Sequence, residues 1–111
     1  MLPKGTHWLI IGFVKPYTWD PHKNERLIRE RGLSFEAILW SIQSGGLLDI
    51  VKHSNPGKYP NQKVYVVKAF DYVFLVPFEE NDHEIRLITI IPSRKALRMY
   101  IERSGSDENQ T

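Results

Sequence analysis

Residues 17–36 read Tyr17-Thr18-Trp19-Asp20-Pro21-His22-Lys23-Asn24-Glu25-Arg26-Leu27-Ile28-Arg29-Glu30-Arg31-Gly32-Leu33-Ser34-Phe35-Glu36. A short aromatic strand at 17–19 is predicted to run into a helix here. Asp20 is a suitable N-cap, and Pro21 follows at the first helical position, where its missing N–H does no harm. The helix is expected to end at Arg31, because Gly32 readily takes the left-handed conformation that stops a helix.

A second helix is predicted to start after Ser34, another N-cap residue, and to end at the glycine pair 45–46. Its apolar positions have clean helical spacing: Phe35, Ile38, Leu39 and Ile42. The first helix has a much thinner apolar stripe, Leu27 and Ile28. Most of its charged side chains are therefore expected to face solvent or a ligand rather than a core.

Downstream, β-prone segments alternate with turn signals. Strands are predicted at Leu47–Lys52, Lys63–Ala69, Tyr72–Glu79 and Ile85–Ile91. The first two are separated by a long loop at 53–62, and Phe70-Asp71 is expected to form a tight hairpin turn. In the last strand, alternation predicts Arg86, Ile88 and Ile90 on one face. Ser93 is expected to cap a third helix that reaches about residue 103.

Successive hairpins favour an α+β fold. We expect a mainly antiparallel sheet of about four to five strands, with two N-terminal helices and one C-terminal helix. Residues 1–16 are interpreted as an N-terminal extension or an extra strand around Trp8–Val14, and residues 104–111 as a disordered tail.

The apolar run within residues 1–16 is far shorter than the roughly 20 residues of a membrane-spanning helix. The chain has 111 residues, which suits one domain.

Composition sets wide limits on function. The formal net charge is only +2, from 15 basic and 13 acidic side chains, which permits nucleic-acid binding without requiring it. The chain contains no cysteine, so disulfides and thiolate metal sites are excluded and a cytoplasmic protein is expected. No histidine pair has metal-ligand spacing and the acids are dispersed, so neither a metal nor another cofactor is predicted.

The motif at 17–36 resembles the opening of BrnT toxins, which belong to the RelE-like ribonuclease superfamily. Three further parts of residues 17–103 extend the similarity: Leu47–His53 with Lys58–Gln62 and Tyr65–Val67, Asp71–Phe78, and Ile90–Ala96. The resemblance implies a compact toxin that cleaves RNA and inhibits translation. It also implies a cognate antitoxin encoded in the same operon, binding of operator DNA only through that antitoxin, RNA (including ribosome-bound mRNA) as substrate, and no membrane.

Cleaving RNA without a metal requires activation of the 2′-hydroxyl, stabilisation of the phosphorane charge and a proton for the leaving oxygen. The resemblance implies that basic side chains do this work. We predict Lys23, Arg86 and Arg94 as catalytic residues. We predict a second set as RNA-binding residues: His22, Arg26, Lys58, Tyr59, Lys95 and Arg98. Cations from both ends of the chain are thus expected to converge on one nucleotide backbone.

Each of these residues also has a structural interpretation. Lys23, Arg26 and Glu30 share a helix face, which could be an ordinary solvated surface with an Arg26–Glu30 pair. Arg94 could form a salt bridge with Glu79 or Glu84, and Arg86 must either be paired or serve a site. Trp19 and Trp40 are expected in the core, whereas Tyr59 is the better candidate for stacking on a base.

Three functions remain open at this point. The first is a metal-independent endoribonuclease toxin. The second is a catalytically inactive toxin-like module that binds an antitoxin or RNA, which the modest net charge and the lack of a standard acid–base pair favour. The third, and weakest, is a gyrase poison.

Overall fold

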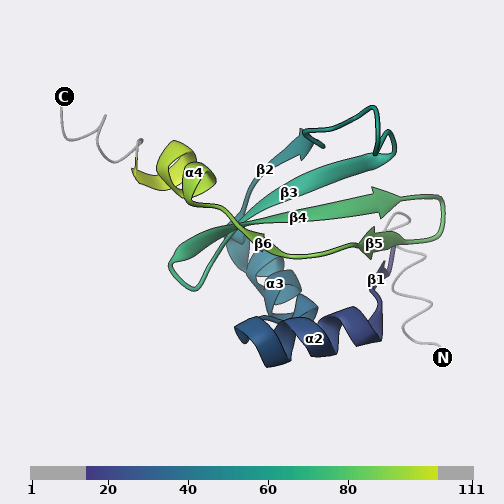
Figure 1. The fold of residues 1–111 in the computed structure, drawn as a ribbon, viewed down its shortest axis with the longest axis horizontal. Coiled ribbons are helices and arrows are strands. Elements are labelled where there is room, and N and C mark those ends of the chain that lie inside the picture. The colour runs from purple at the N-terminus through teal and green to yellow at the C-terminus, as the bar shows by residue number, and fades with distance from the viewer. Residues whose placement is uncertain (1–14, 103–111) are drawn as a thin grey trace.

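A computed structural model describes residues 15–102. It is an α+β fold with a mixed six-stranded sheet (Figure 1). The elements are β1 (Tyr17–Thr18), α2 (Pro21–Arg31), α3 (Phe35–Ser41), the π-helical turn η1 (Ile42–Gly46), β2 (Leu47–Lys52), β3 (Gln62–Ala69), β4 (Tyr72–Glu80), β5 (Ile85–Leu87), β6 (Ile91–Pro92), α4 (Arg94–Leu97) and η2 (Arg98–Glu102). The strand expected at Trp8–Val14 and the tail 104–111 lie outside the described residues.

The strand order is β1-β5-β4-β3-β2, with β6 paired to β4. Of the strand pairs within 15–102, β1–β5 is parallel and the other four are antiparallel. Among the described residues, no helix is both long and apolar enough to span a bilayer.

The helix ends follow the capping chemistry of the sequence. The Asp20 carboxylate accepts a hydrogen bond from the His22 backbone N–H at 2.9 Å, and Gly32 adopts φ 67° after α2. The Ser34 hydroxyl accepts from the Ala37 N–H at 3.0 Å, and that of Ser93 accepts from Ala96 at 3.1 Å. The predicted caps are therefore confirmed.

The main core lies between one face of the sheet and the helices α2 and α3 (Figure 1). Phe35 and Ile38 of α3 are fully buried, and Trp19 stacks on Phe35 with ring centroids 5.6 Å apart. On the sheet, Tyr65 stacks on Phe78 at 3.9 Å, and burial raises the pKa of the Tyr65 phenol. Neutral aromatic rings thus fill the layer between sheet and helices.

Among residues 15–102, α4 and η2 cover the opposite face of the sheet at one end. There Ala96, Leu97 and Tyr100 pack against Val66 and Val73. The Tyr100 hydroxyl donates to the Asp49 carboxylate at 2.7 Å, which ties η2 to β2. α4 therefore lies on the other side of the sheet from α2 and α3 (Figure 1).

The strand predicted at 85–91 is interrupted by a bulge. Leu87 pairs with Phe78 and Ile91 with Leu75, so residues 88–90 stand opposite only residues 76–77. One extra residue reverses the alternation. Leu87 and Ile90 are both buried in the main core, 1% and 0% exposed, so the prediction that Ile90 shares a face with Arg86 is wrong.

Candidate nucleic-acid interface

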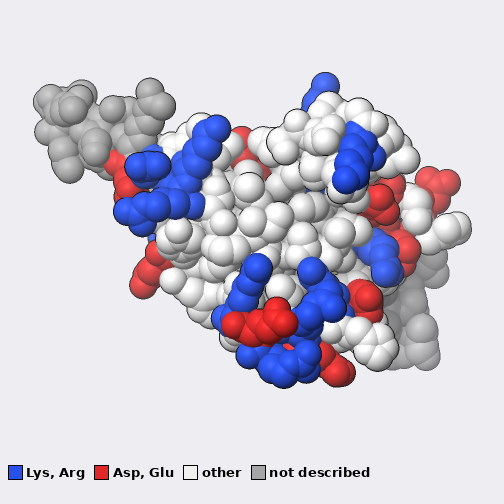
Figure 2. Space-filling view, viewed as in Figure 1, with Lys and Arg blue, Asp and Glu red and all other residues white. Residues whose placement is uncertain are grey.

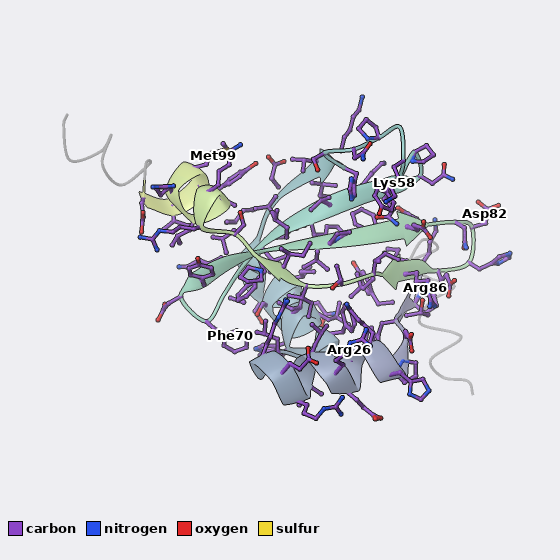
Figure 3. All side chains as sticks on the ribbon, in the orientation of Figure 1. Arg26, Lys58, Phe70, Asp82, Arg86 and Met99 are labelled. Carbon is purple, nitrogen blue, oxygen red and sulfur yellow. The ribbon has the colours of Figure 1, made fainter. Side chains whose placement is uncertain are left out.

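Three of the predicted site residues line one open pocket of about 360 Å³. Lys23 and Arg26 come from α2, and Arg86 comes from β5, far away in the sequence. We call this pocket the basic cleft; its full lining is Asp20, Lys23, Arg26, Arg86, Leu87, Ile88 and Thr89. Figure 3 shows Arg26 and Arg86 in the same part of the molecule, between α2 and β5.

The helix wall of the cleft is set by the start of α2. Asp20 caps the helix, and Lys23 and Arg26 lie three residues apart, so their side chains emerge as neighbours on one face. Leu27, one helical turn after Lys23, is 3% exposed, so the face of α2 that meets the core adjoins the face of Lys23. Ile28, expected beside Leu27 in the apolar stripe, is 49% exposed, so the helix is anchored along a single narrow line.

A buried amide holds α2 against α3. Asn24 is 7% exposed; its Oδ1 accepts from the Phe35 N–H at 2.8 Å, and its Nδ2 donates to Glu36 Oε1 at 2.7 Å. The Phe35 N–H lies in the first turn of α3, where no helical carbonyl is available to it. Asn24 therefore replaces a missing backbone partner and sets the angle between the two helices.

The strand wall of the cleft is tied to the same helix. Arg31 Nη1 donates to the Ile90 carbonyl at 3.1 Å, within the bulged segment. On the other side of the bulge, the Ile88 N–H donates to the Pro77 carbonyl at 2.8 Å. Both walls are thus fixed by hydrogen bonds that involve neither Lys23 nor Arg86.

The cations of the cleft form no ion pair with any other residue that the structure describes. Within residues 15–102, the only salt bridge shorter than 4 Å joins Lys15 to Glu80, at 2.8 Å. The alternative pairs considered for Arg26 and Arg94 are therefore absent at that distance. Arg86 is the cross-strand partner of Glu79, yet the charged groups of these two residues are more than 4 Å apart. Cations that form no ion pair are available to an anionic ligand.

The remaining predicted residues lie elsewhere. Arg94, Lys95 and Arg98 are exposed on α4 and η2, and none of them lines the basic cleft. Figure 2 shows basic side chains gathered over α4 and, separately, over α2, with uncharged surface between the two groups. The convergence expected of cations from both ends of the chain is found in this cleft for Lys23, Arg26 and Arg86 only.

The loop between β2 and β3 forms a small ordered cluster. The rings of His53 and Tyr59 lie 4.5 Å apart, and Lys58 Nζ is 5.3 Å from the centre of the Tyr59 ring. His53 Nδ1 also accepts from the Asn55 N–H at 3.0 Å. Tyr59 is half-buried, so part of its ring already packs inside the loop. Neither Lys58, Tyr59 nor His22 lines the basic cleft.

Several features of the cleft could not be found from sequence patterns. Asp20 contributes a carboxylate to the lining, although its evident role is the helix cap. Ile88 and Thr89 enter the lining through the bulge, which leaves no sequence signal. The expectation of a core position for Trp40 is wrong: it is 71% exposed, because it lies about 200° around α3 from the buried Ile38.

Chemically, the basic cleft can hold a phosphate group between three cations. Besides these cations the lining contains the Asp20 carboxylate, and it contains no histidine. Residues 15–102 hold no cluster of three potential metal ligands. In comparisons with protein-family models, curated proteins and solved structures, none matches this chain.

Proposed function

We propose that this protein is a RelE/BrnT-like toxin of a type II toxin–antitoxin system, acting as a metal-independent endoribonuclease that inhibits translation. One observation carries the proposal: Lys23, Arg26 and Arg86 line a single cleft, and none of the three forms an ion pair with another residue of 15–102. The motif resemblance of residues 17–103 supplies the class of enzyme. The cleft supplies a place where an RNA phosphate would be bound.

In the proposed reaction the 2′-hydroxyl of RNA attacks the adjacent phosphorus, and the bond to the 5′-oxygen breaks. Lys23 is the group that would move a proton, and Arg26 and Arg86 would stabilise the phosphorane charge. The products are a 2′,3′-cyclic phosphate and a free 5′-hydroxyl. No oxidant or metal is needed to balance this step.

The test uses the purified full chain and end-labelled single-stranded RNA, with and without ribosomes, in the presence of EDTA. Lys23→Ala and Arg86→Ala should each slow cleavage by about 10²-fold or more, because each removes charge at the reacting phosphate. Lys63→Ala is the matched control, since it removes one exposed cation of β3 outside the cleft. Wild-type cleavage by both cleft variants would refute the site.

The runner-up is a catalytically inactive module of the same fold that binds RNA or an antitoxin. The absence of a histidine from the cleft favours it. Such a module would bind single-stranded RNA with a salt dependence that weakens by about 0.7 in slope for each cation removed. Binding without cleavage, and without growth arrest on expression, would select this alternative.

The proposed cellular partner is the antitoxin encoded in the same operon. Expression of the toxin alone should arrest growth, and co-expression of the neighbouring gene product should restore it. Growth arrest with induced DNA damage, and without RNA cleavage, would instead indicate a gyrase poison.

A further inference from the structure

A second pocket of about 360 Å³ lies at the other end of the helical layer. It is formed by the end of α3, the turn η1 and the β3–β4 hairpin. We call it the aromatic pocket; its lining is Trp40, Ser41, Ser44, Gly45, Gly46, Lys68, Ala69, Phe70 and Asp71. Its two large aromatic side chains are the most exposed apolar groups of the described chain, Trp40 at 71% and Phe70 at 65%.

The hairpin presents Phe70 at a conformational cost. Phe70 and Asp71 adopt φ 54° and 60°, the left-handed values of a two-residue turn that normally selects asparagine and glycine. A phenylalanine in this conformation gains nothing from the core, because its ring stands in solvent. Such a residue is explained when its ring has a use outside the folded monomer.

Backbone segments pack closely together at one wall of the pocket beside Phe70. A Cβ atom on Gly46 would lie 2.5 Å from the Lys68 carbonyl oxygen and 2.7 Å from that of Ser41, so three segments of backbone meet there at close range. A preformed pocket and a protruding ring thus occupy the same small surface. The pocket is open to solvent and its lining is more polar than apolar, but its volume exceeds the roughly 150 Å³ of a cavity that accepts a benzene ring, so it has room for a phenylalanine side chain.

We propose that this surface joins two copies of this chain in a symmetric dimer, in which Phe70 of each copy enters the aromatic pocket of the other. A twofold interface requires one surface that is complementary to itself, and a ring next to a ring-sized pocket meets that requirement. The charges of the pocket are also complementary to themselves, because Lys68 and Asp71 line it with opposite signs. Across the twofold axis, Lys68 of one copy can approach Asp71 of the other. One cation balanced by one anion does not favour a nucleic acid.

The dimer is expected to be weak and concentration-dependent, because the surface is small compared with stable interfaces. Sedimentation velocity of the full chain over a wide concentration range should show a monomer–dimer equilibrium. Trp40→Ser should weaken dimerisation by about thirtyfold, as for a central aromatic contact. Met99→Ser, which alters another exposed apolar residue at 47% exposure, should leave it unchanged.

Phe70→Asn separates the interface from the fold. Asparagine tolerates the left-handed turn better than phenylalanine, so the variant monomer should melt at a higher temperature while the dimer is lost. Charge inversion adds a second arm: Lys68→Glu and Asp71→Lys should each weaken the dimer, and the double variant should recover it. These readouts do not depend on RNA cleavage.

Three results would overturn the proposal. A wild-type chain that stays monomeric at every concentration is one. A dimer that survives both Trp40→Ser and Phe70→Asn is another. A monomeric chain that binds a different protein through Trp40 would assign the surface to that partner and not to a second copy.

Discussion

The basic cleft and the aromatic pocket have equal volumes of about 360 Å³, yet they are built in opposite ways. They lie at opposite ends of β4, whose first residue follows the hairpin of Phe70 and whose penultimate residue, Glu79, pairs with Arg86 (Figure 3). One pocket presents three cations and the single carboxylate of Asp20, and the other presents two aromatic rings with one cation and one anion. The difference indicates that one sheet can hold two surfaces suited to different partners.

The sharpest test of this comparison crosses the two sets of variants. Lys23→Ala with Arg86→Ala should reduce RNA cleavage by roughly 10²–10³-fold and leave dimerisation intact. Trp40→Ser with Phe70→Asn should abolish dimerisation and leave cleavage per chain unchanged. Cleavage gels and sedimentation velocity are measured for both pairs of substitutions. Loss of both properties in either set would show that the two surfaces are one functional unit.

The largest stability effect is expected at the aromatic pocket. Gly46→Ala should lower the free energy of unfolding by about 3 kcal/mol, because its Cβ meets backbone oxygens that cannot rotate away. Gly57→Ala is the matched control: its nearest neighbour, Asn55 Oδ1, lies at 3.8 Å, an ordinary contact. Urea unfolding measures both. Equal stability of the two variants would mean that the pocket wall yields easily.

Asn24 joins the helix of the cleft to the helix of the aromatic pocket. Asn24→Ala should cost about 2–3 kcal/mol in unfolding free energy, because it leaves the buried Phe35 N–H without an acceptor. Glu36→Ala, which removes only the exposed end of the same network, should cost less than about 1 kcal/mol. The prediction fails if urea unfolding ranks the two variants in the reverse order.

Arg31 tests whether the bulge needs its tie to α2. Arg31→Met keeps the apolar stem but loses the bond to the Ile90 carbonyl, so a cost of about 1 kcal/mol is expected. Arg29→Met, which alters an exposed neighbour on the same helix, should change stability by less than about 0.5 kcal/mol. Amide hydrogen exchange at residues 88–90 should accelerate in the first variant alone.

The smallest effect is expected on the other face of the sheet. The hydrogen bond that Tyr100 donates to Asp49 raises the pKa of the Tyr100 phenol above its ordinary value of 10.0. The bond therefore stabilises the fold below pH 10.0, and this stabilisation is lost as the pH rises through the pKa of the folded state. Tyr100→Phe should cost no more than about 0.5 kcal/mol near pH 8, since the pair is exposed. The difference between wild type and variant should vanish in alkaline solution. A gap that widens with pH would contradict this sign.

Sequence reasoning succeeded wherever the chemistry is local. The caps at Asp20, Ser34 and Ser93 depend on residues two or three positions apart, and the hairpin at Phe70-Asp71 on two neighbours. It failed for the strand at 85–91, because a one-residue bulge depends on pairing with β4 and on the Arg31 bond. It also failed for Trp40, although the helical spacing of the buried Phe35 and Ile38 already places Trp40 on the far side of α3.

The candidate site divides in the same way. Basic character at Lys23, Arg26 and Arg86 was readable from residue type, since charge is a property of each side chain. Their common cleft, and the distance of Arg94, Lys95 and Arg98 from it, depended on how β5 pairs with β4 beside α2. Local hydrogen bonds join residues that are close in the sequence, so the residue types at those positions are enough to predict them. Neighbours across a sheet are chosen by packing of the whole chain, which only the folded structure reveals.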